Sequence, residues 1–213
     1  MNNKIIIITA DPNSINSEII SKMWKKISNN VRKKIYLVGN YNLINQQFKK
    51  LKLTQKIIQV ENLNDHSFSP KLKIINVPLN FKDPFKVSFK DASKYLIKSF
   101  HLANKLTKKK DVKGLINCPI DKKLIKNTNK VGVTEFFASI CKVVDKSEIM
   151  MIYNKSLSVV PLTTHIDLKN ISKKITKKLI VKKIESLNKN FKKIFKKKPK
   201  IGVLGPNPHN GEF

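Results

Sequence analysis

Residues 5–27 read IIIITADPNSINSEIISKMWKKI, and this stretch decides the fold class. Residues 5–9 form a continuous run of β-branched residues that stops at Asp11-Pro12, a pattern typical of a fully buried strand. Ser17-Glu18 then opens a segment whose apolar residues recur at helical spacing: Ile19, Ile20, Met23, Trp24 and Ile27. The sequence therefore predicts a strand, a loop and a helix, which is the first unit of an α/β fold.

The same alternation continues along the chain. Further apolar runs predict strands at residues 34–38, 57–60, 72–79, 112–117, 149–153, 157–162 and 201–204. Apolar residues at helical spacing predict helices near residues 43–51, 91–108 and 134–144, and a long helix from a Ser172 cap to about residue 195. Strands and helices in alternation, with continuous apolar strands, predict an α/β fold with a mostly parallel sheet.

Lysine dominates the charge of the chain. Lys and Arg together number 44 against 14 Asp and Glu, a formal net charge of +30, and Arg32 is the one arginine. Proteins that read phosphates and base edges favour arginine for its bidentate fork, whereas lysine and the 28 isoleucines and 23 asparagines have AT-rich codons. We therefore favour a compositional origin and expect no nucleic-acid partner. A non-catalytic, lysine-rich nucleic-acid-binding protein stays open as an alternative.

Cysteine usage and hydropathy indicate the compartment. Cys118 and Cys141 have neither the number nor the spacing of a disulfide framework or a thiolate zinc site, which favours a reducing environment. The run of four isoleucines before Asp11 is too short for a signal peptide, and no stretch approaches the roughly 20 apolar residues of a membrane span. We expect a cytoplasmic protein that does not associate with membranes.

Ligands of open α/β sheets bind beyond the carboxyl ends of the strands, so the loops after the predicted strands are the candidate site. The relevant loops are residues 9–12, 117–122, 163–165 and 206–209. His165 and His209 lie in the last two loops, and neutral imidazole is a common ligand of divalent metals. Two such histidines favour a shared metal ion, although a single loop histidine is more often only solvated. Lys122 differs from the other lysines only in its place in a strand-end loop.

Four motifs carry a resemblance to a known family: Cys118-Pro-Ile-Asp-Lys122, Gly132-Val-Thr-Glu-Phe-Phe-Ala138, Thr163-Thr-His-Ile-Asp-Leu168 and Pro206-Asn-Pro-His-Asn-Gly-Glu212. In order and spacing they resemble the 4-hydroxythreonine-4-phosphate dehydrogenase family of pyridoxal phosphate biosynthesis, and Thr9-Ala-Asp-Pro12 with Glu18 is similar to its N-terminal motif. The resemblance implies an isocitrate/isopropylmalate dehydrogenase-like fold with two lobes and the C-terminal third of the family's length absent. We place the lobes at residues 1–127 and 128–213, the second with the metal and dimerisation elements.

The resemblance also implies an activity. A family member is a homodimeric, NAD-dependent oxidoreductase that needs a divalent metal (Zn, Mg or Co) and acts on a phosphorylated small molecule. It oxidises and decarboxylates 4-phosphohydroxy-L-threonine to 3-amino-2-oxopropyl phosphate in vitamin B6 (pyridoxine) biosynthesis. By this resemblance Lys122 is a catalytic residue near the substrate, Thr134 contacts the substrate, and His165 and His209 bind the metal. No residue is assigned to NAD, and we expect the 213-residue chain alone to be inactive.

The chain departs from the family pattern at two places. Val133 stands where the family has histidine in Gly-His-Thr-Glu-Phe, which leaves open a paralogue that oxidises a phosphorylated sugar acid such as D-threonate or D-erythronate 4-phosphate. The loop at residues 10–17 lacks the glycines of the family, so we expect asparagine or serine to adopt any positive φ that it needs.

Overall fold

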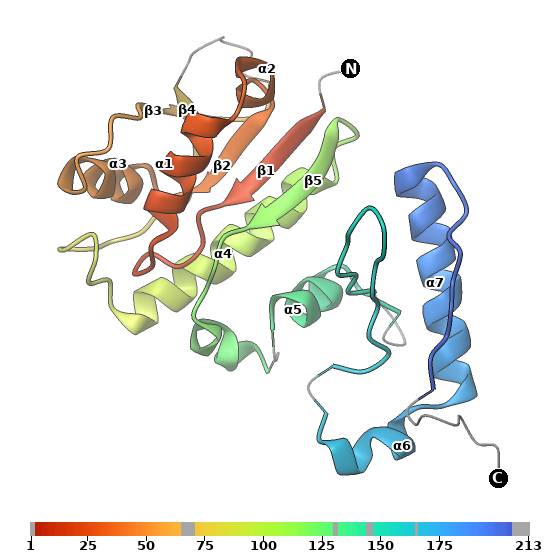
Figure 1. Cartoon of the computed structure of the whole chain (residues 1–213). Coiled ribbons are helices and arrows are strands. Elements are labelled where there is room, and N and C mark those ends of the chain that lie inside the picture. Colours follow the sequence, from red (N-terminus) through yellow and green to blue (C-terminus); the bar gives the residue numbers. More distant parts are fainter. Residues whose placement is uncertain (1–2, 65–70, 130–131, 144–146, 165, 206–213) are drawn as a thin grey trace. The chain divides into compact units, whose positions relative to one another are not determined.

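The computed structural model describes residues 3–64, 71–129, 132–143, 147–164 and 166–205. The chain divides into two compact units, residues 1–141 and residues 142–213, here called unit 1 and unit 2. Unit 1 holds a parallel sheet with helices, and unit 2 holds a long helix with irregular segments (Figure 1).

A five-stranded sheet forms the centre of unit 1. Its strands are β1 (Lys4–Ile8), β2 (Ile35–Gly39), β3 (Ile57–Val60), β4 (Leu72–Asn76) and β5 (Val112–Asn117), in the order β3-β4-β2-β1-β5. All four pairings are parallel, which confirms the predicted α/β fold. The chain passes from β1 to β2 on one side and returns after β4 to the other side of β1. The carboxyl ends of β1 and β5 therefore flank the point where the strand order reverses.

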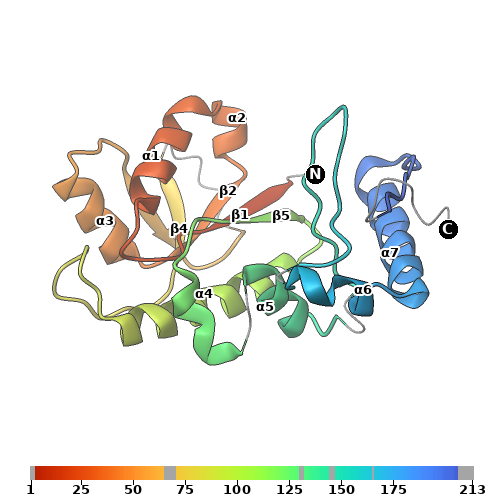
Figure 2. The ribbon, with the colours of Figure 1, turned by 60° about the horizontal axis from the view of Figure 1, so that its bottom comes forward.

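Helices cover both faces of this sheet. They are α1 (Asn16–Lys26), α2 (Asn29–Arg32), α3 (Tyr41–Lys50), α4 (Phe89–Thr107), the 3-10 helix η1 (Lys122–Thr128) and α5 (Val133–Ile140). Figure 2 shows α1 and α3 on one face and α4 on the other. The ring of Phe100 on α4 lies 5.2 Å from that of Phe136 and 5.1 Å from that of Phe137, so α5 packs on α4. The helices predicted for this part of the chain are confirmed, although α5 ends four residues before residue 144.

The hydrophobic core of the described residues lies in unit 1, between Ile6 and Phe136. Its centre is the sheet, where several strand residues are 0% exposed: Ile6, Ile8, Leu37, Val38 and Ile74. A fully buried Ile or Leu side chain stabilises a fold by about 1.5–3 kcal/mol. The continuous apolar runs of the sequence thus correspond to strands that helices bury on both faces.

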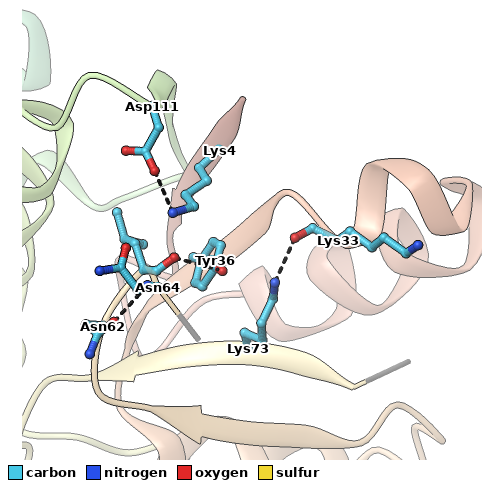
Figure 3. A network of polar contacts seen from close by, with 8 residues as sticks. Lys4, Lys33, Tyr36, Asn62, Asn64, Lys73 and Asp111 are labelled. Carbon is cyan, nitrogen blue, oxygen red and sulfur yellow. Dashed lines mark hydrogen bonds and ion pairs between the residues drawn. The ribbon is translucent and has the colours of Figure 1, made fainter. Parts of the chain in front are cut away.

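Two lysines are buried near the amino ends of the strands, and each has a polar partner (Figure 3). Lys4 forms an ion pair with Asp111, and its hydrogen bond lowers the pKa of that carboxyl group. Lys73 Nζ donates to the carbonyl oxygen of Lys33 at 2.7 Å and lies 4.0 Å from the centre of the Tyr36 ring. These contacts compensate the cost of burying two ammonium groups.

Unit 2 contains no buried residue in its described part. Its helices are η2 (Leu168–Asn170), α6 (Ile171–Lys174) and α7 (Lys177–Phe195). The rings of Tyr153 and Phe195 stack with their centroids 5.1 Å apart, but other large apolar side chains stay exposed, among them Ile152 at 64%, Leu168 at 87% and Leu204 at 91%. The described part of unit 2 therefore has no hydrophobic core of its own.

Three strands predicted for unit 2 are wrong, whereas the long helix is confirmed over Lys177–Phe195 and only its start differs. Residues 149–153 and 157–162 form only a single antiparallel bridge between Ile152 and Val159, and residues 201–204 have no regular structure. A strand needs a neighbour along its length for its backbone groups, and the described part of unit 2 provides one only at this single bridge. The helix predicted from Ser172 is interrupted, because Ile175 is extended and Thr176 caps α7.

The lobe boundary expected near residue 127 differs from the division between the compact units, which falls after Cys141. The packing of α5 on α4 places residues 133–140 with unit 1. The assignment of lobes 1–127 and 128–213 stays a prediction.

Candidate functional site

The loop after β1 leaves the sheet through a left-handed residue. Ala10 has a φ of 60° and is 1% exposed, a conformation that costs a non-glycine residue roughly 1–2 kcal/mol. The expectation that an asparagine or serine of this loop would take the positive φ is therefore wrong. Asp11 follows, and its carboxylate accepts hydrogen bonds from the amide of Asn13 at 2.9 Å and from that of Asp121 at 3.1 Å. The loop after β1 is thereby joined to the loop after β5.

Asn16, at the start of α1, binds the same two loops. Its side-chain Nδ2 donates to the carbonyl oxygens of Thr9 at 2.9 Å and of Pro119 at 2.8 Å. Gln47 on α3 donates to the carbonyl oxygen of Pro12 at 2.8 Å. These buried tertiary hydrogen bonds explain how the strained backbone at Ala10 persists.

The loop after β5 carries Lys122. The amide of Cys118 continues the hydrogen bonding between β1 and β5, since it donates to the carbonyl oxygen of Ile8 at 3.2 Å. Asp121 then caps η1, since its Oδ1 accepts from the amide of Lys123 at 2.8 Å. Lys122 is the exposed first residue of η1, and so lies just beyond the carboxyl end of β5. Its catalytic role stays a prediction.

The thiol in this loop is buried. Cys118 is 5% exposed, and burial raises its pKa to about 11. The thiolate, which is the nucleophilic form, is therefore scarce at neutral pH. Cys118 thus has a structural role.

Thr134 is exposed in the first turn of α5. Gly132, the N-cap residue, leaves room for the side chain of Glu135, because a Cβ at position 132 would lie 2.9 Å from Glu135 Oε2. The neighbouring Val133 is half-buried and packs against the core of unit 1. Contact between Thr134 and a substrate stays a prediction.

A buried tyrosine supports the loop after β1 from helix α4. Tyr95 is 1% exposed, and its hydroxyl accepts from the amide of Asn40 at 3.0 Å. The same hydroxyl shares a second hydrogen bond, 2.8 Å long, with Thr9 Oγ1. Burial raises the pKa of Tyr95, which keeps this hydroxyl neutral. Sequence reasoning missed Tyr95, because its spacing marks it only as part of an apolar helix face.

The two histidines proposed as metal ligands, His165 and His209, both lie outside the described residues. Across the described ranges, no group of three or more His, Cys, Asp and Glu residues could hold a metal ion. The predicted ligand pair is thus not among the side chains described, and the metal site stays a prediction.

The profile of the family described as "Pyridoxal phosphate biosynthetic protein PdxA" matches residues 31–213. The chain belongs to the PdxA family. This membership confirms the resemblance that the four motifs carry and connects the chain with oxidoreductases of pyridoxal phosphate biosynthesis.

Two curated PdxA relatives are both named 4-hydroxythreonine-4-phosphate dehydrogenase. The chain is 34% identical over 217 residues to the protein of Aquifex aeolicus (strain VF5), and 32% identical over 210 residues to that of Sulfurihydrogenibium sp. (strain YO3AOP1). These alignments cover 100% and 97% of this chain but only 65% and 63% of the relatives. The PdxA-family chain therefore spans just under two thirds of their length.

Solved structures confirm the PdxA fold. The crystal structure of 4-hydroxythreonine-4-phosphate dehydrogenase from Klebsiella pneumoniae matches with a TM-score of 0.84 at 24% identity, covering 99% of this chain and 66% of that one. The X-ray structure of 4-hydroxythreonine-4-phosphate dehydrogenase from Burkholderia phymatum matches with a TM-score of 0.83 at 24% identity, covering 100% and 65%. At this identity the likeness shows the α/β fold alone.

No helix in the described part of the chain combines the length and the hydropathy that a membrane span requires.

Proposed function

We propose that this PdxA-family chain acts as a cytoplasmic, NAD- and divalent-metal-dependent 4-hydroxythreonine-4-phosphate dehydrogenase. Its substrate is 4-phosphohydroxy-L-threonine, and its product after oxidation and loss of CO2 is 3-amino-2-oxopropyl phosphate. Family membership over residues 31–213 is the observation that carries the proposal. The exposed positions of Lys122 and Thr134 in unit 1 support it further.

The proposed roles follow from the chemistry of the side chains. Lys122 binds an anionic oxygen of the substrate, since its ammonium group is a compact, mobile charge at the carboxyl edge of β5. The hydroxyl of Thr134, in the first turn of α5, donates to a substrate oxygen. When bound, the divalent metal, held by His165 and His209, and NAD supply the Lewis acid and the hydride acceptor. The net charge of +30 attracts the phosphorylated substrate.

The proposal includes a homodimer. Exposed large apolar side chains in unit 2, such as Ile152, Leu168 and Leu204, support it, because a second copy that covered them would remove them from water. The relatives are longer than this chain, and their additional residues are a second means of covering these apolar side chains.

One observation favours a different substrate. Val133 packs against the core, so position 133 offers no polar group to a substrate amine. This supports, as the second candidate, a paralogue that oxidises D-threonate or D-erythronate 4-phosphate, because neither compound carries an amine. The nucleic-acid-binding alternative gains no support, since exposed lysines are scattered over both units, as Lys22, Lys94 and Lys178 illustrate.

The test measures NADH formation from each phosphorylated substrate, with and without chelator. Two proteins are compared: the 213-residue chain and the same chain extended to the length of its relatives. We expect chelator-sensitive turnover of 4-phosphohydroxy-L-threonine by the extended chain and none by the 213-residue chain, which spans 65% of the Aquifex relative. Turnover of only the sugar acids would favour the second candidate, and turnover of neither substrate class would contradict both.

Single substitutions test the site. In the extended chain, Lys122→Met should lower kcat/KM at least about tenfold, because a charged hydrogen bond to substrate is lost. Lys123→Met is the matched control, since Lys123 is the exposed neighbour on η1, and it should leave kcat/KM unchanged. Equal effects of the two substitutions on kcat/KM would show that Lys122 is not part of the site.

A further inference from the structure

The carboxylate of Asp11 connects two segments that lie far apart in the sequence. Its Oδ1 accepts from the amide of Asn13 at 2.9 Å, which is a local turn, and its Oδ2 accepts from the amide of Asp121 at 3.1 Å, 110 residues away. Asp11 is 9% exposed, so both bonds form largely out of water. Hydrogen bonds to an ionised acceptor in such a setting are among the stronger ones in proteins.

The donor of this hydrogen bond belongs to the cap of η1. Asp121, whose amide binds Asp11, is the N-cap residue of η1, and its own carboxylate accepts from the amide of Lys123 at 2.8 Å. Lys122 lies between these two amides. The position of its backbone is therefore set by a chain of two carboxylates, first Asp11 and then Asp121.

The segment around the acceptor, Asp11, is itself held in place. Ala10, directly before Asp11, is kept at a φ of 60°. Asn13, two residues further, exchanges two side-chain hydrogen bonds with the backbone of Val87, at 2.9 Å and 2.8 Å. Strained backbone of this kind persists where surrounding contacts over-determine it, and it concentrates at functional sites.

We propose that Asp11 is a positioning residue: it fixes the loop after β5 so that Lys122 meets an anionic ligand at the carboxyl edge of the sheet. The inference rests on the proposed function for the role of Lys122 in substrate binding. Asp11 itself does not contact the ligand. Lysine has a flexible four-carbon side chain, so fixing its backbone determines which positions the ammonium group can reach.

The test uses Asp11→Asn with a matched control. Asparagine preserves the local turn to Asn13 but replaces the second acceptor by an amide donor that opposes the Asp121 amide. Asp83→Asn is the control, because Asp83 Oδ1 accepts from the amide of Phe85 at 2.9 Å in the same local turn and binds no distant backbone amide in the described residues. Hydrogen exchange of the Asp121 amide should become at least about tenfold faster in Asp11→Asn and stay unchanged in Asp83→Asn.

Binding of 4-phosphohydroxy-L-threonine, measured by calorimetry, gives the functional readout. Asp11→Asn and Lys122→Met should each raise Kd about tenfold, and the double variant should bind no more weakly than Lys122→Met alone, because both substitutions remove one interaction. Unchanged exchange at Asp121, or effects that multiply in the double variant, would overturn the proposal. These measurements use the chain extended to the length of its relatives. If that unsubstituted extended chain bound no ligand, the proposed function and the role in binding would both fail, while the exchange data would still decide whether Asp11 orders the loop.

Discussion

At the scale of single residues, the carboxyl edge of the sheet depends on close approach between β1 and β2. A Cβ at Gly39, the last residue of β2, would lie 2.2 Å from Oγ1 of Thr9, which follows β1. Thr9 cannot easily move away, because its hydroxyl is bound to the buried Tyr95. Glycine at position 39 is therefore a steric requirement of this edge.

Gly39→Ala should destabilise unit 1 by about 1–3 kcal/mol, as overpacking of a filled interior does. Gly114→Ala on β5 is the control, because a Cβ there meets nothing within 4 Å, and its effect should be near zero. Urea unfolding followed through Trp24 fluorescence measures both variants. Equal urea midpoints for the two variants would show that Thr9 moves aside at no cost in stability.

The buried thiol of Cys118 predicts a loss of stability at alkaline pH. Well below pH 9 the thiol is protonated in both states, whereas between its ordinary pKa of 9.0 and its folded pKa of about 11 only the unfolded chain loses the proton. Stability should fall with rising pH across this window, by an amount on the order of 2 kcal/mol. Cys118→Ala should show a flatter pH profile in urea unfolding. Identical pH profiles of unfolding free energy for the unsubstituted chain and for Cys118→Ala would contradict the raised pKa of Cys118.

At the scale of elements, the end of α3 shows a lysine where glycine is preferred. The amide of Leu53 donates to the carbonyl oxygen of Phe48 at 2.8 Å and that of Lys52 to Lys49 at 3.1 Å, which together form a Schellman motif. Lys52 has a φ of 53° and is exposed. The helix therefore ends in a left-handed residue whose side chain makes that conformation costly.

Lys52→Gly should stabilise unit 1 by about 0.5–1 kcal/mol, because glycine adopts positive φ without strain. Lys49→Gly, an exposed substitution inside the last turn of the same helix, should instead cost about 1 kcal/mol. Thermal unfolding of both variants measures the difference. Destabilisation by Lys52→Gly would mean that its positive φ carries no strain.

The ion pair between Lys4 and Asp111, at the starts of β1 and β5, predicts that substituting either partner has a different effect on thermal stability. Asp111→Asn leaves the buried ammonium of Lys4 without its counter-charge and should lower Tm by several degrees. Lys4→Met removes the buried charge as well and should have a much smaller effect. Differential scanning calorimetry compares the two. A larger loss for Lys4→Met than for Asp111→Asn would assign the pair a net stabilising role.

At the scale of the whole molecule, the two units differ in how they are stabilised. The core of the described residues ends at Phe136, and unit 2 contributes no buried side chain to it. Net stability arises from burial of apolar surface against conformational entropy. Unit 1 buries enough apolar surface to offset the entropy that it loses on folding, and the described part of unit 2 does not.

We therefore expect a fragment of residues 1–141 to fold cooperatively, and a fragment of residues 142–213 to lack cooperative unfolding. Circular dichroism and urea titration of the two fragments measure this, with the 213-residue chain as reference. A cooperative transition in the fragment of residues 142–213 alone would show that residues outside the described ranges complete a core there.

The sequence by itself determined the α/β class, the strands and main helices of unit 1 and the family, because these depend on local patterns: β-branched runs, helical periodicity and motifs of five to seven residues. It also singled out the loops of Asp11 and Lys122. Only the tertiary structure decided that Asp11 binds the amide of Asp121, that Ala10 takes the positive φ, and that residues 201–204 form no strand. Each of these depends on a partner distant in sequence, whose presence or absence no local pattern encodes.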